Sequence, residues 1–551
     1  MPAPTKVVSV TSPAPRPAAT APCALADLRT VLADTGADAA FDAAAVLGVT
    51  HDSRQVRPGD LYAALPGAHV HGARFAAQAL AAGAVAVLTD PAGAHLISTD
   101  SDRDGSPTPA LALSSLSAAG SAPVPVLVSA DPRRDLAAVA ARVYGDPSAR
   151  LRLLGVTGTN GKTTTAFLLD AGLRAAGHTT GLIGTVETRV GAQRLASAHT
   201  TPEASDLQAL LALMVERGVD AAAMEISSHA LAQHRADALH VAGALFTNLS
   251  QDHLDFHPTM EDYFEAKATL FAPGRADVAV IGVADPWGRR LAARRPDAIT
   301  FAVEGPADWT VAQLSAGPTG SDLVAHGPRG LRVPLSVPLP GRFNVANALG
   351  ALALLVAVGV DANRAAAGIG ALPGVPGRME RVEAGQPFLA LVDFAHTPDA
   401  VTTLLETVRP LVKGRLITVL GCGGDRDRGK RPLMGEAAAT LADLAILTSD
   451  NPRSEDPAAI LAEMLAGVPA HLRVDSRVLV RPDRSTAIAA AVAAAGPQDA
   501  VVVAGKGHES GQEQAGVITP FDDRIVLRAA LDALDAGHRA AAEGPTGRVR
   551  G

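Results

Sequence analysis

Short apolar runs recur through the middle and last thirds of the chain, and each is followed by a polar or small-residue loop and then by a segment with helical periodicity. These runs are 151–156, 221–224, 242–247, 388–392, 416–420, 444–448 and 500–504. Strands that alternate with helices are typical of parallel sheets covered by helices on both faces. The pattern therefore predicts an α/β fold and excludes an all-helical or all-β chain.

Unusual polar residues gather just past the ends of these runs. Glu225, Asn248 and Asp393 each follow a predicted strand directly, Asp450 lies two residues past the run 444–448, and Glu509 lies in the loop after 500–504. Open α/β sheets bind ligands beyond the carboxyl ends of their strands. We therefore expect the binding and catalytic groups at those edges.

The length of 551 residues predicts roughly three to four domains. Residues 1–22 are rich in Pro, Ala and Thr and are expected to form a disordered tail. A first compact region, about 25–148, is interrupted by the Ser/Gly/Asp/Pro-rich stretch 91–123, which we interpret as a surface insertion. The chain after about residue 537 is expected to be loose.

Composition and charge narrow the class of protein. Hydrophobic residues make up 48% of the chain, and the net charge of −8 argues against a general nucleic-acid or membrane-surface binder. Cys23 and Cys422 are the only cysteines, so neither a disulfide framework nor a cysteine metal cluster is available. The longest apolar run, 348–360, falls short of the ~20 residues of a membrane helix, and the N-terminus has no signal-peptide h-region. We expect a cytoplasmic protein with no nucleic-acid or membrane partner.

The clearest chemical motif is a phosphate loop between the strand 151–156 and a helix from Lys162. Its glycines allow backbone N–H groups to approach phosphate, Lys162 suits the β- and γ-phosphates, and the Thr163 hydroxyl suits Mg²⁺. Val156 stands where the full Walker pattern has glycine, so the match is to the shorter GTNGKT form. The loop comprises Gly158, Thr159, Asn160, Gly161, Lys162 and Thr163.

Segment 157–164 resembles the ATP loop of the Mur ligases and of their folylpolyglutamate synthetase relatives. Further segments, in family order, are similar to the MurE branch: HDSR at 51–54, TTP at 200–202, EISSH at 225–229 with Gln233 and Arg235, DHLD at 252–255, Lys267, GRFNVAN at 341–347, GRM at 377–379, DFAHTP at 393–398, GGDRD at 423–427, DNPR at 450–453 and GKGHE at 505–509. The resemblance implies three domains: a smaller α/β UDP-binding domain (23–149), a central P-loop ATPase domain with a parallel sheet (150–376) and a Rossmann-like amino-acid-binding domain (377–536), followed by the tail 537–551.

The resemblance also implies a reaction. A Mur ligase of this branch uses ATP and Mg²⁺ to add diaminopimelate, in its meso or LL form, to UDP-N-acetylmuramoyl-L-alanyl-D-glutamate. ATP phosphorylates the carboxylate of D-Glu, and the amine attacks the acyl phosphate. Such a reaction brings polyanionic groups together, so Mg²⁺ and cationic side chains carry most of the catalysis. The protein is expected to be a monomer.

Residue roles follow from the matching motifs. The resemblance assigns catalysis to Lys162, Glu225, His253 and Lys267, and metal binding to Thr163, Glu225, His253 and a carbamylated Lys267. The carbamate turns a cation into an anion able to bind Mg²⁺, which an ammonium cannot do. ATP contacts are implied for the loop residues Gly158, Thr159, Asn160, Gly161, Lys162, Thr163 and Thr164, and for Asn344, Arg378 and Asp393, with Asn347 a further candidate.

Two groups of residues are implied for the other substrates. The UDP-muramoyl dipeptide is assigned Ser53, Arg54, Thr200, Thr201, Ser227, Gln233 and Arg235. Diaminopimelate is assigned Arg426, Asp450, Asn451, Arg453, Gly505 and Glu509. Arg453 offers a bidentate fork for the carboxylate that distinguishes diaminopimelate from lysine, and Glu509 offers an acceptor for the neighbouring ammonium. The alternative is that Arg453 only pairs with a helix-start acid such as Glu455.

The sequence departs from the family at several positions, and it leaves other functions open. Only Asp285 remains of an expected Asn-x-Asp-Asp run at the adenine end, and Phe256 and Phe394 replace tyrosines. L-Lysine as the added amino acid, a folylpolyglutamate-synthetase-like ligase and a nucleotide-sensing scaffold are the alternatives. Retention of Lys162, Glu225, His253 and Lys267 argues against the scaffold.

Overall fold

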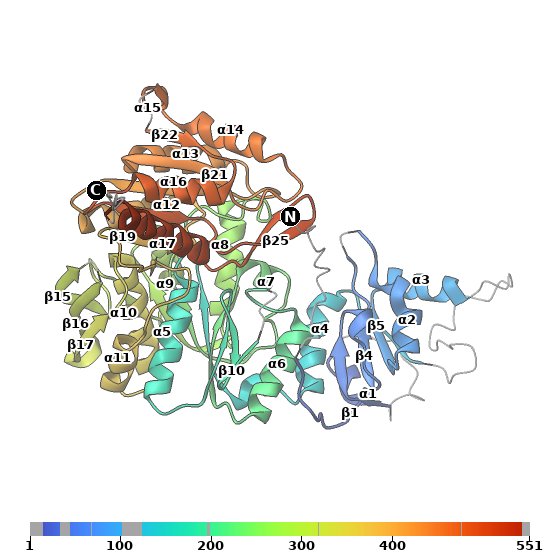
Figure 1. Cartoon of the computed structure of the whole chain (residues 1–551). Helices are drawn as coiled ribbons and strands as arrows, with labels where there is room; N and C mark the ends of the chain where they lie inside the picture. The colour runs from blue at the N-terminus through green and yellow to red at the C-terminus, as the bar shows by residue number, and fades with distance from the viewer. Residues whose placement is uncertain are drawn as a thin grey trace, which may run out of the picture.

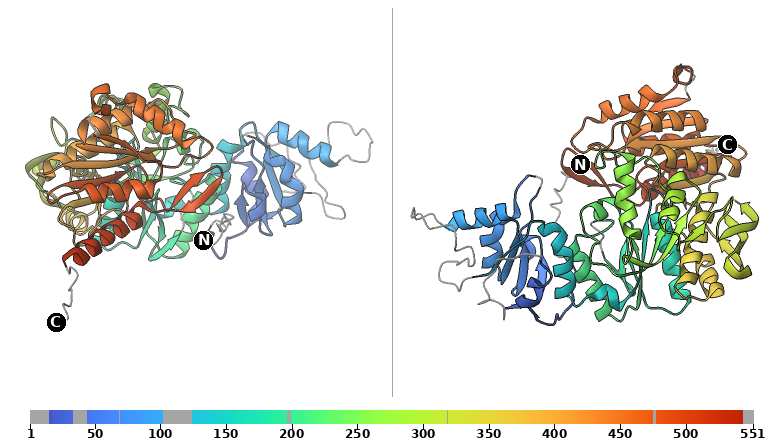
Figure 2. Two further views of the ribbon diagram at one scale, coloured as in Figure 1. Left: turned by 45° about the horizontal axis from the view of Figure 1, so that its top comes forward. Right: turned by 180° about the vertical axis from the view of Figure 1, so that it is seen from behind.

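Three bodies, each built around its own sheet, make up the computed structural model of the chain (Figure 1). It describes residues 15–32, 44–67, 69–101, 124–195, 199–317, 319–474 and 477–542. Figure 2 shows the N-terminal body to one side of the other two, attached through helices α4 and α6. The three-domain α/β fold expected from the sequence is confirmed.

The N-terminal body holds a four-stranded parallel sheet in the order β3-β4-β5-β6. Its strands are β3 (Gly48–Thr50), β4 (Asp60–Ala63), β5 (Ala86–Thr89) and β6 (Val126–Val128). Its helices are α1 (Leu25–Arg29), α2 (Ala76–Ala81), α3 (Pro91–Ser101) and α4 (Pro132–Val143), and β1 (Cys23–Ala24) pairs with β2 (Ala45–Val46). α3 occupies the start of the predicted insertion 91–123, so that stretch begins as a helix; 102–123 lie outside the described residues.

The expectation that residues 1–22 form a disordered tail is wrong for 15–22. Arg16 makes a buried ion pair with Asp60 (Nη1 to Oδ2, 2.6 Å), and the backbone N–H of Ala18 donates to the carboxylate of Glu216. These contacts tie the segment to β4 and to helix α6 (Ala204–Glu216). Composition alone did not reveal them because a single arginine supplies the anchor.

The central body is built on an eight-stranded sheet in the order β10-β9-β8-β11-β7-β12-β13-β14, parallel from β8 to β14. The strands are β7 (Arg152–Thr157), β8 (Thr180–Ile183), β9 (Thr188–Val190), β10 (Gln193–Leu195), β11 (Ala221–Glu225), β12 (Val241–Phe246), β13 (Ala276–Gly282) and β14 (Ile299–Phe301). One face is covered by α5 (Lys162–Ala175), α10 (Arg342–Ala357) and α11 (Ala362–Gly370), and the other by α6, α7 (Ser228–Ala232), α8 (Met260–Ala268) and α9 (Pro286–Arg294).

A three-stranded antiparallel sheet, which the sequence pattern did not predict, packs beside α10 and α11. It consists of β15 (Thr310–Gly317), β16 (Gly320–His326) and β17 (Arg332–Val337). In β17, buried and exposed residues alternate strictly, as expected of a strand with one face on the core. In β15, buried and exposed residues do not alternate regularly, so the segment as a whole gives a weak strand signal.

The C-terminal body has a six-stranded sheet in the order β18-β19-β23-β20-β21-β22, parallel except at β18. Its strands are β18 (Glu380–Arg381), β19 (Leu389–Asp393), β20 (Leu416–Cys422), β21 (Leu444–Ser449), β22 (Val478–Val480) and β23 (Ala500–Ala504). Helices α12 (Pro398–Val408), α13 (Lys430–Leu441) and α14 (Pro457–Gly467) cover one face, and α16 (Arg484–Ala494) and α17 (Asp523–Ala542) cover the other. The short helix α15 (Ala470–Val474) and the hairpin β24 (Gly511–Gln514) and β25 (Val517–Pro520) complete the body.

All seven predicted strands are present, and α5 begins at Lys162 as predicted. Thr397 caps α12 by accepting a hydrogen bond from the N–H of Ala400, and Pro398 occupies the first turn. Helix α17 continues to Ala542, so the expectation of a loose chain from about 537 is wrong for 537–542. Residues 543–551 lie outside the described residues. In the described part of the chain, no helix is both long and apolar enough to cross a membrane.

The Arg16–Asp60 pair yields the first prediction. Arg16→Ala leaves the Asp60 carboxylate buried without its partner, which costs about 3–5 kcal/mol of unfolding free energy. Urea denaturation of the two proteins measures the difference. Arg217→Ala removes an exposed arginine and should change stability by less than ~0.5 kcal/mol. Equal midpoints for wild type and Arg16→Ala would show that the segment is not anchored.

Candidate active site

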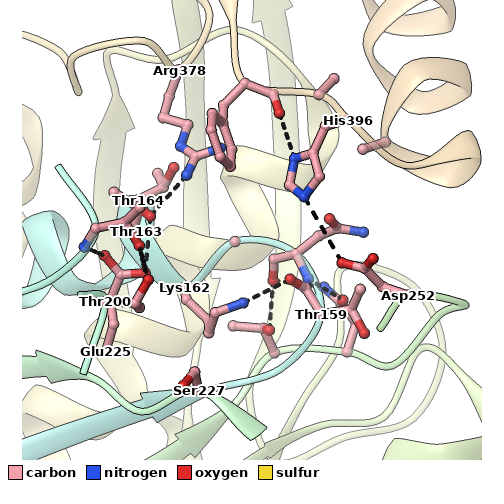
Figure 3. Close-up of a pocket in the computed structure, with 18 of the residues that line it drawn as sticks. Thr159, Lys162, Thr163, Thr164, Thr200, Glu225, Ser227, Asp252, Arg378 and His396 are labelled. Carbon is pink, nitrogen blue, oxygen red and sulfur yellow. Dashed lines mark hydrogen bonds and ion pairs between the residues drawn. The ribbon is translucent and has the colours of Figure 1, made fainter. Parts of the chain in front are cut away.

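A cavity of about 590 Å³ lies where the central and C-terminal bodies face each other. Its walls come from the carboxyl ends of β7, β11 and β12 in the central body, and from the segment that precedes β18 and the segment that follows β19 in the C-terminal body. Figure 3 shows Thr163, Glu225 and Lys162 on one side of this space and Asp252 and His396 on another. Both sheets thus face the cavity with the carboxyl ends of parallel strands, as the strand-end pattern predicted.

The phosphate loop connects β7 to α5 and depends on glycine at two positions. Gly158 and Gly161 have φ values of +146° and +86°, which side chains rarely tolerate. A Cβ atom at Gly158 would overlap the hydroxyl of Thr247, and one at Gly161 would overlap the amide oxygen of Asn347. The backbone of the loop can therefore lie directly against β12 and α10.

Two lysine side chains converge on one backbone oxygen in this loop. Lys162 Nζ donates to the carbonyl of Gly158 at 3.0 Å, and Lys267 Nζ donates to the same oxygen at 2.8 Å. Burial lowers the pKa of Lys162, and it lowers the pKa of Lys267 well below its ordinary value, with the nearby Lys162 charge acting in the same direction. Lys267 is thus favoured as a neutral amine.

Glu225 lies at the end of β11 and is surrounded by hydroxyl donors. Its Oε2 accepts from Thr163 Oγ1 at 3.0 Å and from Thr185 Oγ1 at 3.2 Å, and its Oε1 accepts from the N–H of Thr185 at 2.8 Å. The Thr163 and Glu225 oxygens are hard ligands of the kind Mg²⁺ binds together with phosphate and water. Among the described residues, no three His, Cys, Asp or Glu side chains are grouped to hold a metal.

Arg378 reaches from the C-terminal body to the phosphate loop, where its Nη2 donates to Thr163 Oγ1 at 3.0 Å (Figure 3). Its guanidinium lies 4.4 Å from the ring centroid of Phe394. Asp393 accepts from the N–H groups of Met379 and Ala395, so its carboxylate fixes the segment that carries Arg378. Burial raises the pKa of Asp393, against the opposing charge of Arg378.

His253 has a left-handed backbone (φ +56°) and packs edge-on against the ring of His229. Burial lowers the pKa of His253 to about 3, so its imidazole is neutral and can act as a metal ligand. The ring of His229 stacks on Phe256 at 4.2 Å. The phenylalanine therefore supports the histidine pair by ring contact, which does not need the hydroxyl of a tyrosine.

Asp252 is a charge contact between the bodies. Its carboxylate lies 3.9 Å from His396 Nε2 and 3.9 Å from Lys430 Nζ, both in the C-terminal body. Burial acts to raise the pKa of Asp252, but these groups and His253 lower it to about 2. Asn160 adds a second contact, because its Nδ2 donates to Asp399 Oδ2 at 3.1 Å.

The central-body residues expected to hold the dipeptide lie close together. Arg235 donates to the carbonyl of Thr201 at 3.0 Å and to the side chain of Gln233 at 2.6 Å, and it pairs with Glu203 at 2.9 Å. Thr201 in turn accepts from the N–H of Ser227. Thr200, Thr201, Ser227 and Arg235 line the cavity.

Ser53 and Arg54 lie in the N-terminal body and do not line this cavity. Ser53 is buried and donates to Gln78, and the exposed Arg54 pairs with Asp52 at 2.8 Å. That pairing lowers the pKa of Asp52 to about 2. A role at the UDP end requires a substrate long enough to reach from one body to the next.

The residues expected to bind the amino acid come together around loops at the ends of β20, β21 and β23. Asn451 Nδ2 donates to Glu509 Oε2 at 2.8 Å, and a Cβ atom at Gly505 would lie 2.7 Å from Asp450 Oδ2. Arg426 lines the cavity and lies next to Gly423, against which the guanidinium of Arg453 also packs.

Arg453 does not pair with Glu455. Glu455 is bound instead by the fully buried Arg431 (Nη2 to Oε1, 2.7 Å), whereas Arg453 donates to the carbonyl of Gly424 at 2.7 Å and has Glu513 at 3.5 Å. The backbone of Arg453 is left-handed (φ +52°), a conformation that costs free energy and is often found at functional sites. The hairpin stabilises it: the Arg453 N–H donates to Glu513 O.

The two asparagines of α10 are held to each other and to the helix start. Asn344 Nδ2 donates to the carbonyl of Pro340 at 2.8 Å, and Asn347 Nδ2 donates to Asn344 Oδ1 at 3.2 Å. Both line the cavity, as do Thr164, Thr159 and Asn160 of the loop. Asp285, the remnant of the adenine motif, caps α9 through the N–H groups of Trp287 and Gly288.

Sequence reasoning missed Thr185 and undervalued Asp252. Thr185 follows β8 at the same sheet edge and contacts both Glu225 and Thr200, so the strand-end rule could have found it. In the sequence, Asp252 stands out only as the first residue of the DHLD motif. Its partners come from the other body and carry no signal near it in the sequence.

Comparison with known proteins places these features in a family. Three models match the chain: the Mur ligase family catalytic domain at residues 45–115, the Mur ligase middle domain at 156–355, and the Mur ligase glutamate ligase domain at 377–507. A UDP-N-acetylmuramoyl-L-alanyl-D-glutamate–2,6-diaminopimelate ligase of Streptomyces coelicolor is 53% identical over 94% of this chain and 98% of its own. The enzyme of that name from Corynebacterium glutamicum is 46% identical over 88% and 92%.

Solved structures of Mur ligases have the same fold as this chain. A structure of a UDP-N-acetylmuramoyl-L-alanyl-D-glutamate–2,6-diaminopimelate ligase, 32% identical, superposes with a TM-score of 0.62 over 94% of this chain and all of the other. The MurF ligase of Thermotoga maritima in complex with ADP shares the fold at 17% identity, with a TM-score of 0.59 over 90% and 98%. A phosphate loop that faces a second parallel-sheet body across one cavity defines a three-domain, ATP-dependent ligase. The chain belongs to the Mur ligase family.

The phosphate loop yields the second prediction. Lys162→Ala should abolish amide formation, because this cation is placed to neutralise charge that develops during phosphoryl transfer. ADP release is measured with both other substrates present, and thermal unfolding checks that the fold is intact. Lys413→Ala, which removes an exposed lysine, should keep normal turnover. Substantial activity in a stable Lys162→Ala protein would place the ATP site elsewhere.

Proposed function

We propose that this chain uses ATP to add 2,6-diaminopimelate to UDP-N-acetylmuramoyl-L-alanyl-D-glutamate in the synthesis of peptidoglycan precursors. The observation that carries the choice of amino acid is the arrangement of Arg453: its guanidinium packs against Gly423 beside Arg426 instead of pairing with Glu455. Asn451, in the same loop as Arg453, donates a hydrogen bond to Glu509 and so connects that loop to the one that holds Glu509. A cation and an acceptor side by side match the distal carboxylate and ammonium of diaminopimelate.

L-Lysine fits this arrangement less well. It has the distal ammonium but lacks the carboxylate that would engage Arg453. The high identity to ligases named for diaminopimelate supports the same choice. The reaction takes place in the cytoplasm, where the nucleotide-linked substrate and ATP are available, and the active unit is a monomer.

The chain's own residues position phosphate and neutralise its charge. The backbone of Gly158–Thr163 surrounds the phosphates at the start of α5, Lys162 supplies a positive charge, and Arg378 supplies another from the C-terminal body. Thr163 and Glu225 would hold Mg²⁺, since their oxygens lie 3.0 Å apart at the cavity wall. Bound Mg²⁺ would neutralise negative charge on the phosphates.

Lys267 is proposed to carry a carbamate. A neutral lysine amine reacts with CO₂ to give a carbamate and a proton, and the lowered pKa of Lys267 favours that neutral amine. The carbamate oxygens would be metal ligands close to His253, which is also proposed to bind metal. The observed hydrogen bond to Gly158 O places Lys267 Nζ directly behind the phosphate loop.

The dipeptide end of the sugar nucleotide is proposed to lie along Thr200, Thr201, Ser227, Gln233 and Arg235. Arg235 is held rigidly by the Thr201 carbonyl and Glu203, so its remaining donors are pre-organised for a carboxylate or phosphate. Arg133 of α4 also pairs with Glu203, at 3.0 Å. This ion-pair bridge connects the N-terminal body, where Ser53 and Arg54 are proposed to contact UDP, to the reacting end.

The third prediction tests the carbamate. Lys267→Ala should be nearly inactive, and Lys267→Glu or a short-chain carboxylate added to Lys267→Ala should restore part of the activity. Wild-type enzyme equilibrated with ¹³C-bicarbonate should show a carbamate carbon resonance that is missing in Lys267→Ala. A fully active wild-type enzyme without that resonance would contradict the proposal.

The fourth prediction concerns Arg453. Loss of a desolvated arginine–carboxylate pair costs about 2–5 kcal/mol, or roughly 30- to several-thousand-fold in affinity. Arg453→Ala should therefore raise the KM for diaminopimelate steeply and change the KM for ATP much less. Arg528→Ala, an exposed arginine on α17, is the control.

Steady-state kinetics with meso-diaminopimelate, LL-diaminopimelate and L-lysine measure both the choice of amino acid and the role of Arg453. A wild-type preference for L-lysine would overturn the proposed substrate. An unchanged diaminopimelate KM in Arg453→Ala would overturn the role of this arginine.

A further inference from the structure

Lys506 is a fully buried lysine beneath the proposed amino-acid site. It lies in the loop after β23 between Gly505 and Gly507, whose φ values of +113° and +56° turn the chain sharply. The lysine side chain has no exposed surface, so a ligand in the cavity cannot touch it. A buried ammonium is costly unless it is paired, and its partners indicate its role.

Both hydrogen bonds of the Lys506 ammonium go to residues proposed to bind the amino acid. Nζ donates to Glu509 Oε2 at 2.8 Å and to Asn451 Oδ1 at 2.9 Å. Asn451 Nδ2 donates to the same Glu509 oxygen at 2.8 Å. The three side chains form a closed triangle that joins the loop after β23 to the loop after β21.

The triangle engages only one carboxylate oxygen of Glu509, Oε2, and makes no hydrogen bond to the other, Oε1. Oε2 accepts two hydrogen bonds, and among the described residues none donates to Oε1. The Glu509 side chain is about one-third exposed, so the remaining oxygen is accessible to a ligand. Two donors on one oxygen fix the carboxylate's orientation before any ligand arrives, which reduces the entropy lost on binding.

We propose that Lys506 is a positioning residue that holds Glu509 with one carboxylate oxygen presented to an ammonium group of the incoming amino acid. The inference rests on the proposed function, because it takes an amino acid with a second ammonium as the ligand. Lys506 also neutralises part of the Glu509 charge. Selectivity therefore comes from the direction of the free oxygen and not from net charge alone.

Lys506→Met tests this, because methionine is close to lysine in length and has no ammonium. Wild type, Lys506→Met, Glu509→Gln and the double variant are compared for kcat, for the KM of the amino acid and for the KM of ATP. Lys413→Met, the same change at an exposed lysine of this body, is the control. The amino acid is diaminopimelate, or whichever amino acid the wild type uses in its place.

We expect Lys506→Met to raise the amino-acid KM about tenfold and to change kcat and the ATP KM by less than about twofold, as expected for loss of ground-state binding. Because Lys506 acts through Glu509, its removal in the Glu509→Gln background should add almost nothing. An unchanged amino-acid KM, additive effects in the double variant, or a joint loss of kcat and ATP affinity would each overturn the proposal.

The design also covers two other results: a Lys506→Met protein that does not fold, and a wild-type enzyme that rejects diaminopimelate. If Lys506→Met does not fold, Glu509→Gln and the double variant still give the answer, since the double variant leaves neither charge unpaired. Equal KM values then support the inference, and a higher value in the double variant overturns it. Wild-type enzyme that rejects diaminopimelate refutes the proposed substrate, while the KM comparison with the accepted amino acid still decides the role of Lys506.

Discussion

The hydrogen bond from Arg378 to Thr163 joins the C-terminal body to the phosphate loop, and the rest of the site depends on that contact. Thr163 is shared, because its hydroxyl also donates to Glu225 in the central body. The Arg378 guanidinium of the C-terminal body and the Glu225 carboxylate of the central body are therefore both hydrogen-bonded to the Thr163 hydroxyl. Phosphate bound there would be in reach of both bodies, so ligand binding and the mutual placement of the two sheets are coupled.

The electrostatic design of the cavity follows from burial. Lys162 and Lys267 share one carbonyl oxygen, and burial disfavours two ammonium charges so close together. Asp252 remains charged because histidine and lysine neighbours lower its pKa to about 2. The central body therefore supplies a carboxylate that attracts the C-terminal body, together with one lysine whose amine is readily neutral. The pKa of Lys267 and the pKa of Asp252 are both lowered, which favours a neutral amine and a charged carboxylate side by side.

Local sequence patterns predicted the strands, the phosphate loop and the polar groups at strand ends, because each depends on a few neighbouring residues. Glu225, Asp393 and Asp450 were found in this way. Contacts between distant segments had no such signal: the binding of Glu455 by Arg431, the anchoring of Arg16 on Asp60, and the approach of Lys430 to Asp252 depend on how helices and sheets pack. The antiparallel sheet β15–β17 gave no clear signal because its first strand, β15, has no regular alternation of buried and exposed residues.

The buried ions of the C-terminal body have a consequence for how such enzymes diversify. Arg431, Arg484 and Lys506 are each paired within this body, by Glu455, by Asp523 and by Glu509 with Asn451. The loops at the amino-acid site therefore keep their shape without help from the phosphate loop. Exchange of those loops can alter which amino acid is joined while the nucleotide machinery stays intact. The loops proposed to select the amino acid and the phosphate loop thus belong to separate sheets, so a change in one need not disturb the shape of the other.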